Sequence, residues 1–154
     1  MVISNLNVSR SNLKRVQNLS SKDFILNNND LIIFSVYLPN FSKIKDELSL
    51  FLNSKEIKKS QHFYKDEDRS RYVIYRAILK ILLAAYTKLD FKNINLSLDF
   101  NKKPYLESHP YLFFNISHSE DYAVMAISNR KIGIDVEYMS EDFKYTDLLP
   151  DIFD

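Results

Sequence analysis

The sequence predicts an α+β domain, in which an antiparallel sheet carries helices on one face. Two patterns predict this class: helical periodicity follows one apolar strand in the middle of the chain, and alternating strand patterns with turn signals fill the last third. Length and composition agree with it, because 154 residues, 45% hydrophobic and 27% charged, suit a single globular domain. We therefore expect one folded unit over residues 30–139.

The first half of this unit is expected to hold one strand followed by helices. Residues 30–38, DLIIFSVYL, form an apolar and β-branched run that ends at a proline, which is typical of a buried strand. Apolar residues then recur at helical spacing through residues 41–63, with a restart after Asn53. The longest helix is expected over residues 66–89, because acidic side chains crowd its first turn, where the helix dipole favours them.

The second half is expected to be rich in strands. Residues 94–100, INLSLDF, alternate apolar and polar positions, as a strand with one solvent-facing side does. Further strands are expected over residues 112–117, 122–128 and 131–138, separated by the turn signals HSED and NR. Outside the unit, residues 1–29 are expected to form a weakly ordered lead-in with one short helix at most, and residues 140–154 an acidic tail.

Composition excludes several classes of function. The chain has no cysteine, which excludes disulfides, thiolate zinc sites and a cysteine nucleophile, and its single glycine excludes glycine-rich phosphate loops. A net charge of +1 argues against general nucleic-acid binding, and no apolar run has the length that a bilayer requires. The first residues lack the layout of a signal peptide, so we expect a cytoplasmic protein that binds neither nucleic acid nor membrane.

An acidic pair in the last expected strand is the first candidate site. In IGIDVE, residues 132–137, strand periodicity places Gly133, Asp135 and Glu137 on one face. Two neighbouring carboxylates repel each other unless a cation lies between them, and hard oxygen ligands beside open space suit Mg²⁺. The alternative is that these acids cover a solvent-facing side of the sheet.

A second candidate site lies in FNISHS, where Ser117 and His118 come at the end of a strand. Hydroxyl and imidazole donors suit a phosphate group, with basic side chains supplying charge, and no partner aspartate marks a hydrolase triad. An ordinary turn remains the alternative. The basic candidates are Lys59, Arg69, Arg71, Lys80, Lys102 and Lys103.

Four segments, taken in order, match the motifs of one family. QHFYKDEDRSRYVIYRAILKILLAAY is similar to a helix that carries arginines towards a ligand, and NKKPYL resembles a Gly-Lys-Pro motif. FNISHS matches a Phe-Asn-hydrophobic-Ser-His-Ser motif, and IGIDVE matches a Gly-hydrophobic-Asp-hydrophobic-Glu motif. On these motifs the sequence resembles the 4'-phosphopantetheinyl transferase superfamily, in particular the larger bacterial type that activates carrier domains of peptide and polyketide synthetases.

The resemblance implies a fold of two similar α+β halves related by a pseudo-twofold axis, with coenzyme A and Mg²⁺, or Mn²⁺, at their junction. It implies transfer of the phosphopantetheine arm of coenzyme A to a serine of an apo acyl or peptidyl carrier protein. Asp135 and Glu137 match the catalytic, metal-binding carboxylates. Ser117 and His118 match contacts to the adenosine end, with His118 at the 3'-phosphate. The matches to cationic phosphate ligands are Lys59, Arg71 and Lys103.

Two departures from the family pattern shape the expected function. Lys102 stands in place of the motif's glycine, a mild change because a loop there need not have positive φ. The family's aromatic-x-x-Lys-Glu helix, which supplies a third carboxylate, has no match in the chain. We therefore expect the N-terminal half of the fold in a truncated form with little activity. The alternatives are one subunit of a split or self-associating enzyme, and a binding module for coenzyme A or the carrier.

Overall fold

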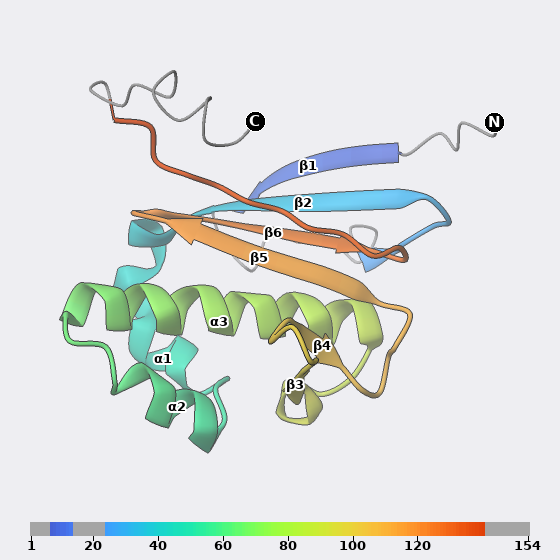
Figure 1. Cartoon of the computed structure of the whole chain (residues 1–154). Coiled ribbons are helices and arrows are strands. Elements are labelled where there is room, and N and C mark those ends of the chain that lie inside the picture. The colour runs from blue at the N-terminus through green and yellow to red at the C-terminus, as the bar shows by residue number, and fades with distance from the viewer. Residues whose placement is uncertain (1–6, 14–23, 141–154) are drawn as a thin grey trace.

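The computed structural model describes residues 7–13 and 24–140 (Figure 1). The expected acidic tail, apart from its first residue, lies outside these ranges. In chain order the elements are β1 (Asn7–Leu13), β2 (Asp30–Tyr37), the 3-10 helix η3 (Leu38–Ile44), α1 (Lys45–Ser49), α2 (Ser54–Ser60), α3 (Asp66–Thr87), the 3-10 helix η4 (Phe91–Asn93), β3 (Leu96–Leu98), β4 (Pro104–Leu106), β5 (Phe113–Ser119) and β6 (Tyr122–Ser128).

The larger sheet forms one layer and the helices form the other, which confirms the predicted α+β class. Its strand order is β1-β2-β6-β5, and the helices lie on one face, with α3 crossing beneath the strands (Figure 1). The β2–β6 and β5–β6 pairs are antiparallel, whereas β1 pairs with β2 in parallel. Strands β3 and β4 form a separate two-stranded sheet, and β4 contacts β5.

Alternation along the central strands divides apolar residues between the two faces of the sheet. Phe34 and Val36 of β2, together with Met125 and Ile127 of β6, are almost fully buried. They face the buried side of α3, whose contribution is Ile74, Ala77, Ile78, Leu79, Leu82 and Leu83. Because each of these side chains leaves water on folding, this layer supplies the main hydrophobic stabilisation and holds β5 in place.

The helices begin where the sequence supplies suitable end groups. In α2, the Asn53 side chain accepts a hydrogen bond from the Glu56 amide, and the Glu56 carboxylate accepts one from the Asn53 amide, which is a capping box. Three acidic residues occupy the first turn of α3. The predicted helix over residues 66–89 is thereby confirmed, whereas the expected helical region 41–63 is divided among η3, α1 and α2.

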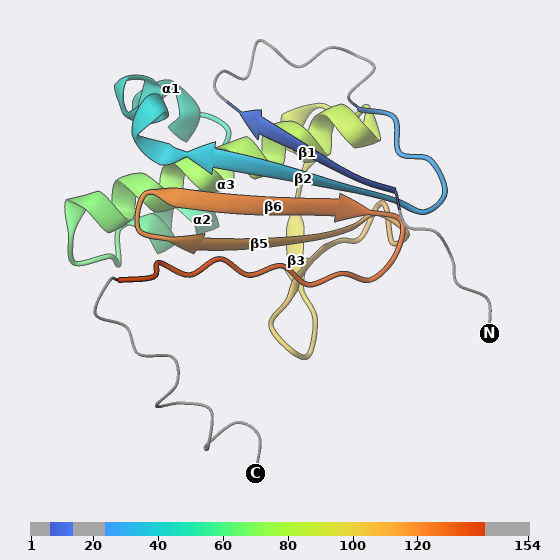
Figure 2. The same cartoon turned by 90° about the horizontal axis from the view of Figure 1, so that it is seen from above.

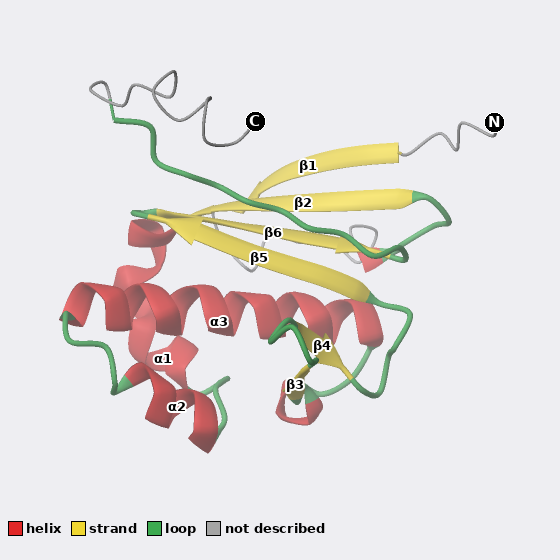
Figure 3. Ribbon diagram, in the orientation of Figure 1, coloured by secondary structure: helices red, strands yellow, loops and turns green. Residues whose placement is uncertain are grey.

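Three sequence expectations differ from the structure. Within the expected lead-in, Asn7–Leu13 forms a strand, because pairing with the edge of β2 supplies hydrogen bonds that no local pattern contains. The strand expected over residues 94–100 shortens to Leu96–Leu98. The segment 131–138, expected as a strand, is extended but has no ladder partner, and it runs beside β5 (Figures 2 and 3).

The loop between β3 and β4 corrects a further expectation. Lys102 has φ of 62°, in the left-handed region that favours glycine, so the position where the motif has glycine does need positive φ. In the part of the chain that the structure describes, no helix is both long and apolar enough to cross a bilayer.

Candidate functional site

Strand β5 carries the candidate site on both of its faces. Phe114 and Ile116 point to the core, and by alternation His118 lies on the same, helix-covered side. Ser117 and Ser119 therefore point to the opposite side, where the extended segment 131–138 lies. The side chains of Ser117 and His118, which are consecutive in β5, thus lie on opposite faces of the sheet.

On the helix side, His118 joins a row of aromatic rings. Its imidazole stacks on Tyr75 of α3, with centroids 4.6 Å apart and an interplanar angle of 23°. Tyr75 meets the edge of Tyr72 at 5.5 Å, and Tyr72 lies 5.3 Å from Phe63. We call Phe63, Tyr72, Tyr75 and His118 the aromatic row. The row fixes the plane of the imidazole, because offset stacking favours a defined ring orientation.

Two of the expected cations lie along this row. The ammonium group of Lys59, on α2, stands 5.5 Å from the centroid of the Tyr72 ring. Arg71 binds three carboxylates: Asp68 at 3.2 Å, Glu120 at 3.4 Å and Asp121 at 3.0 Å. The hydrogen bond that Arg71 donates to Asp121 raises the pKa of the guanidinium, against an opposing effect of burial. Lys59 is the exposed cation of the pair, whereas Arg71 already has anionic partners.

The environment of His118 keeps its ring neutral near pH 7. Partial burial lowers its pKa first, the positive charge of Arg71 lowers it further, and Asp68 partly opposes this. Burial likewise raises the pKa of the Tyr75 phenol, so the ring stacked on His118 is an uncharged partner. A neutral imidazole retains one N–H donor, which a ligand oxygen can accept.

The lowered pKa of His118 predicts an acid-side loss of stability. The unfolded state binds a proton at the ordinary histidine pKa of about 6.5, whereas the folded state binds it only at lower pH. The contribution of His118 to the free energy of unfolding is therefore fully present above about pH 6.5. It falls as the pH decreases from there towards the pKa of His118 in the folded state. Thermal melts of the wild type and His118→Gln between pH 7.5 and 5.5 measure this loss of stability, and His62→Gln is the control. Identical profiles for wild type and His118→Gln would contradict this explanation.

On the opposite side of the sheet, serine hydroxyls of β5 bind residues 131–138, which we call the acidic segment. The Ser117 hydroxyl donates to Asp135 Oδ1 at 2.6 Å and accepts from the Val136 amide at 3.3 Å. The Ser119 hydroxyl accepts from the Tyr138 amide at 3.0 Å. These contacts explain why the expected strand is extended without a ladder: at residues 136 and 138, side chains of β5 receive the hydrogen bonds that a ladder partner's carbonyls would accept.

The acidic segment alternates as its sequence predicts. Ile132, Ile134 and Val136 are partly buried, whereas Gly133, Asp135 and Glu137 are exposed. A Cβ placed on Gly133 would meet nothing within 4 Å, and its φ is not positive, so neither packing nor backbone conformation requires glycine. The backbone is therefore open to close approach from outside.

This donor set fits a magnesium ion. Asp135 and Glu137 offer exposed carboxylate oxygens, and Mg²⁺ is commonly held by one or two carboxylates together with water and substrate oxygens. Within the described ranges, no cluster of three or more acidic, histidine or cysteine side chains arranged to hold a metal is found. Among the described residues, Asp135 and Glu137 are therefore the two carboxylates that this position offers to a metal ion.

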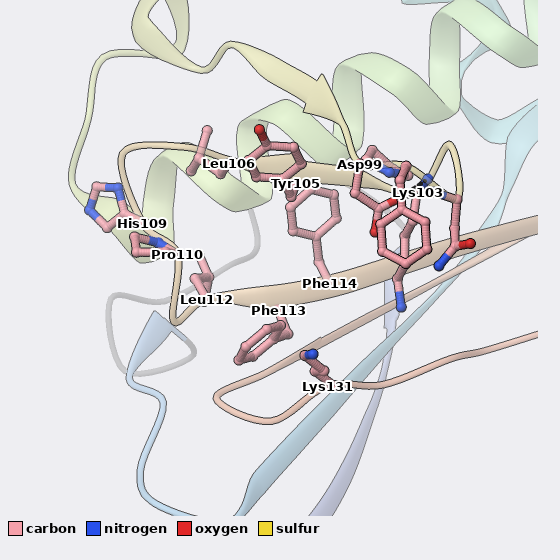
Figure 4. Close-up of a pocket in the computed structure, with 13 residues that line it drawn as sticks. Asp99, Lys103, Tyr105, Leu106, His109, Pro110, Leu112, Phe113, Phe114 and Lys131 are labelled. Carbon is pink, nitrogen blue, oxygen red and sulfur yellow. Dashed lines mark hydrogen bonds between the residues drawn. The ribbon is translucent and has the colours of Figure 1, made fainter.

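Lys103 links the β3–β4 hairpin to the same segment. Its ammonium group donates to the carbonyl of Ile132, directly before Gly133. Beside it, a pocket of about 430 Å³ opens between the hairpin and the start of β5, with aromatic and aliphatic walls and two lysines, Lys103 and Lys131 (Figure 4). The aromatic residues that line it include Tyr105, Phe113 and Phe114. Asp99 also lines the pocket beside the two lysines, and the pocket suits a largely apolar group.

The structure thus arranges the expected residues in two groups. Lys59, Arg71 and His118 gather along the aromatic row, whereas Lys103, Ser117, Asp135 and Glu137 lie with the acidic segment or bond to it. Lys80, expected as a basic candidate, is instead buried against Glu56. Sequence reasoning missed Tyr75, although the spacing of Tyr72 and Tyr75 on one face of a helix was a signal for it. Ser119 is the last residue of the FNISHS motif, but no local signal marks its contact with the Tyr138 amide.

Comparison with known proteins now adds to this geometry. A family profile described as "4'-phosphopantetheinyl transferase, N-terminal" matches residues 38–130. The chain is 31% identical over 109 residues to a Bacillus subtilis protein named 4'-phosphopantetheinyl transferase, covering 70% of this chain and 49% of that protein. It is 33% identical over 102 residues to 4'-phosphopantetheinyl transferase HetI of Nostoc sp., covering 64% and 43%. The chain spans about half the length of these relatives.

Proposed function

Because the chain belongs to the 4'-phosphopantetheinyl transferase family, we propose that it supplies the coenzyme A and metal side of a phosphopantetheine transfer site. The acceptor is a serine of an apo acyl or peptidyl carrier protein. The serine hydroxyl gives its proton to a general base and attacks the β-phosphate of coenzyme A. The bond between this phosphorus and the bridging oxygen of the pyrophosphate breaks, and adenosine 3',5'-bisphosphate leaves. Such a reaction requires neutralisation of charge on several phosphate groups, which the chain's residues are suited to provide.

One observation carries the proposal: consecutive residues of β5 carry an imidazole and a hydroxyl that is bonded to the Asp135 carboxylate. His118 stacks on Tyr75 on one face, and Ser117 binds Asp135 on the other. A ligand with phosphate groups at both ends of an adenosine moiety has anionic oxygens for both faces. This arrangement favours coenzyme A over a ligand with a single phosphate group.

On the helix side, we propose that Lys59 and His118 bind the 3'-phosphate. The neutral imidazole donates its N–H, and the exposed ammonium group supplies the positive charge. Arg71 acts as a nearby positive charge on the pKa of His118, while its ion pairs with Asp68 and Asp121 hold it in position and offset that charge.

On the other side, Asp135 and Glu137 are proposed to hold Mg²⁺, or Mn²⁺, against the pyrophosphate. The bound ion supplies Lewis-acid polarisation of the phosphoryl group undergoing attack. Lys103 retains N–H donors beyond the one given to Ile132, and we propose that they serve a phosphate oxygen next to the pocket. The pocket walls then shield an apolar part of the ligand from water.

A second candidate function is binding of coenzyme A without turnover. The number of carboxylates favours this candidate. Asp135 and Glu137 lie in the segment 131–138, and within residues 7–13 and 24–140 no third acidic side chain joins them in a metal-binding cluster. Turnover would need a general base that another chain or another part of the protein provides.

Calorimetric titration with nucleotides tests the ligand assignment. We expect adenosine 3',5'-bisphosphate to bind at least about 10-fold more tightly than adenosine 5'-monophosphate, since a charge-assisted hydrogen bond contributes on the order of 1.5–3 kcal/mol. Lys59→Ala is expected to remove most of this preference, because it deletes the exposed cation beside the aromatic row.

The matched control is Lys58→Ala, which removes the same charge from a neighbouring exposed position of α2. It should keep the preference of the wild type. Equal affinities of the wild type for the two nucleotides would contradict the 3'-phosphate site, and an equal loss in both variants would reduce Lys59 to a general contribution to net charge.

A further inference from the structure

Ser117 makes two hydrogen bonds that use its hydroxyl in both directions. The O–H donates to Asp135 Oδ1 at 2.6 Å, and the oxygen accepts from the Val136 amide at 3.3 Å. A serine hydroxyl has one donor and two acceptor positions. Its only donor is therefore already directed at the carboxylate, at a distance typical of a charge-assisted bond.

This usage is at odds with a direct phosphate contact by Ser117. A phosphate oxygen accepts hydrogen bonds, so it needs a donor, and the remaining position on the Ser117 oxygen is an acceptor. A phosphate contact would require the hydroxyl to release Asp135. Resting geometry instead assigns the hydroxyl to the carboxylate.

Ser119 offers a natural comparison two residues along the same strand. It also receives an amide hydrogen bond from the extended segment, from Tyr138 at 3.0 Å. It lies on the same face of β5 as Ser117 and is partly buried in the same way. Both serines tether the backbone around Glu137. Among the side-chain contacts that the structure describes between β5 and residues 131–138, Ser117 alone also bonds to a carboxylate.

We propose that Ser117 is a positioning residue that orients the Asp135 carboxylate for a divalent cation. The inference rests on the proposed function in taking Asp135 as a metal ligand. A hydrogen bond to Oδ1 restricts rotation of the carboxylate and leaves Oδ2 and a remaining lone pair for the metal. Groups that orient metal ligands in this way typically contribute about 10- to 100-fold to metal affinity.

The test uses the full chain with Ser117→Ala, Ser117→Thr and Ser119→Ala. Mn²⁺ affinity is measured by electron paramagnetic resonance, and the Asp135 carboxyl carbon is followed by nuclear magnetic resonance without metal. We expect Ser117→Ala to weaken Mn²⁺ binding by about 10- to 100-fold and to move the Asp135 carbon signal. Ser117→Thr, which keeps a hydroxyl, should restore both. Ser119→Ala should change neither, because it loses only the tether at Tyr138.

The two readouts separate the possible failures. An Asp135 carbon signal that is unmoved in Ser117→Ala overturns the positioning role, whatever the metal does. Equal losses of Mn²⁺ affinity in Ser117→Ala and Ser119→Ala also overturn it, because tethering alone then accounts for the effect. If the wild type shows no saturable Mn²⁺ binding, the metal assignment in the proposed function fails, and positioning for a metal fails with it. A carbon shift confined to Ser117→Ala would then support orientation of the carboxylate alone.

Discussion

Replacing Glu56 with alanine is expected to destabilise the protein by about 3–5 kcal/mol, because it leaves a buried cation without its partner. Glu56 Oε2 lies 3.2 Å from Lys80 Nζ, and Oε1 lies 2.7 Å from Arg76 Nε. Lys80 is 1% exposed, so water cannot replace the lost carboxylate without opening the interface between α2 and α3. The substitution also removes half of the capping box that begins α2.

Urea denaturation of wild type and variant measures this effect. Glu47→Ala, which removes an exposed carboxylate from α1, is the control and is expected to change stability by less than about 0.5 kcal/mol. Combining Glu56→Leu with Lys80→Leu should recover much of the loss, because it removes the unpaired charge as well. A loss below about 1 kcal/mol in Glu56→Ala would contradict a buried, energetically coupled pair.

Replacing Asp135 with alanine is expected to lower magnesium-dependent phosphopantetheine transfer by at least about 100-fold, the size of effect typical for losing a group that stabilises transition-state charge. Asp135 is one of the two exposed carboxylates proposed as metal ligands, and Ser117 fixes its orientation. Intact-mass detection of holo carrier protein, after incubation with the chain, coenzyme A and Mg²⁺, measures the transfer directly.

The control for this experiment is Asp46→Ala, which removes a carboxylate whose side chain is 97% exposed in α1 and should leave the rate unchanged. Transfer that survives in Asp135→Ala would contradict the metal assignment. A wild-type chain that yields no holo carrier, assayed beside an active full-length relative, would contradict turnover by this chain alone. The nucleotide titration would then decide between a binding module and no coenzyme A site.

The sequence predicted those elements whose patterns are local. The residues of α3 combine an acidic first turn with apolar side chains at helical spacing, and β6 is an uninterrupted β-favouring run, so each carries its own signal. Strand β1 does not, since its hydrogen bonds come from pairing with β2. The segment 131–138 has a strand's alternation, yet its partners are serine hydroxyls, which depend on tertiary placement.

In the candidate site, too, some features follow from local sequence patterns and others depend on packing. Alternation in the sequence placed Asp135 and Glu137 on one exposed face, and the structure agrees. The contact between Ser117 and Asp135 joins residues 18 positions apart, and the stack of His118 on Tyr75 joins β5 to α3. Neither contact follows from local periodicity, because both depend on how the elements pack. The burial of Lys80 was missed for the same reason.

Ser117 and His118 are neighbours along one pleated strand, and this has a consequence for which ligands fit. Their side chains leave the backbone on opposite sides, so covalent geometry sets the spacing between the imidazole and the hydroxyl that holds Asp135. The alternation does not depend on the helix layer, whereas the orientation of the imidazole does, because the His118 ring stacks on Tyr75 of α3. Under the proposed function, a nucleotide therefore contacts both faces only if the distance between its phosphate groups matches the span across β5.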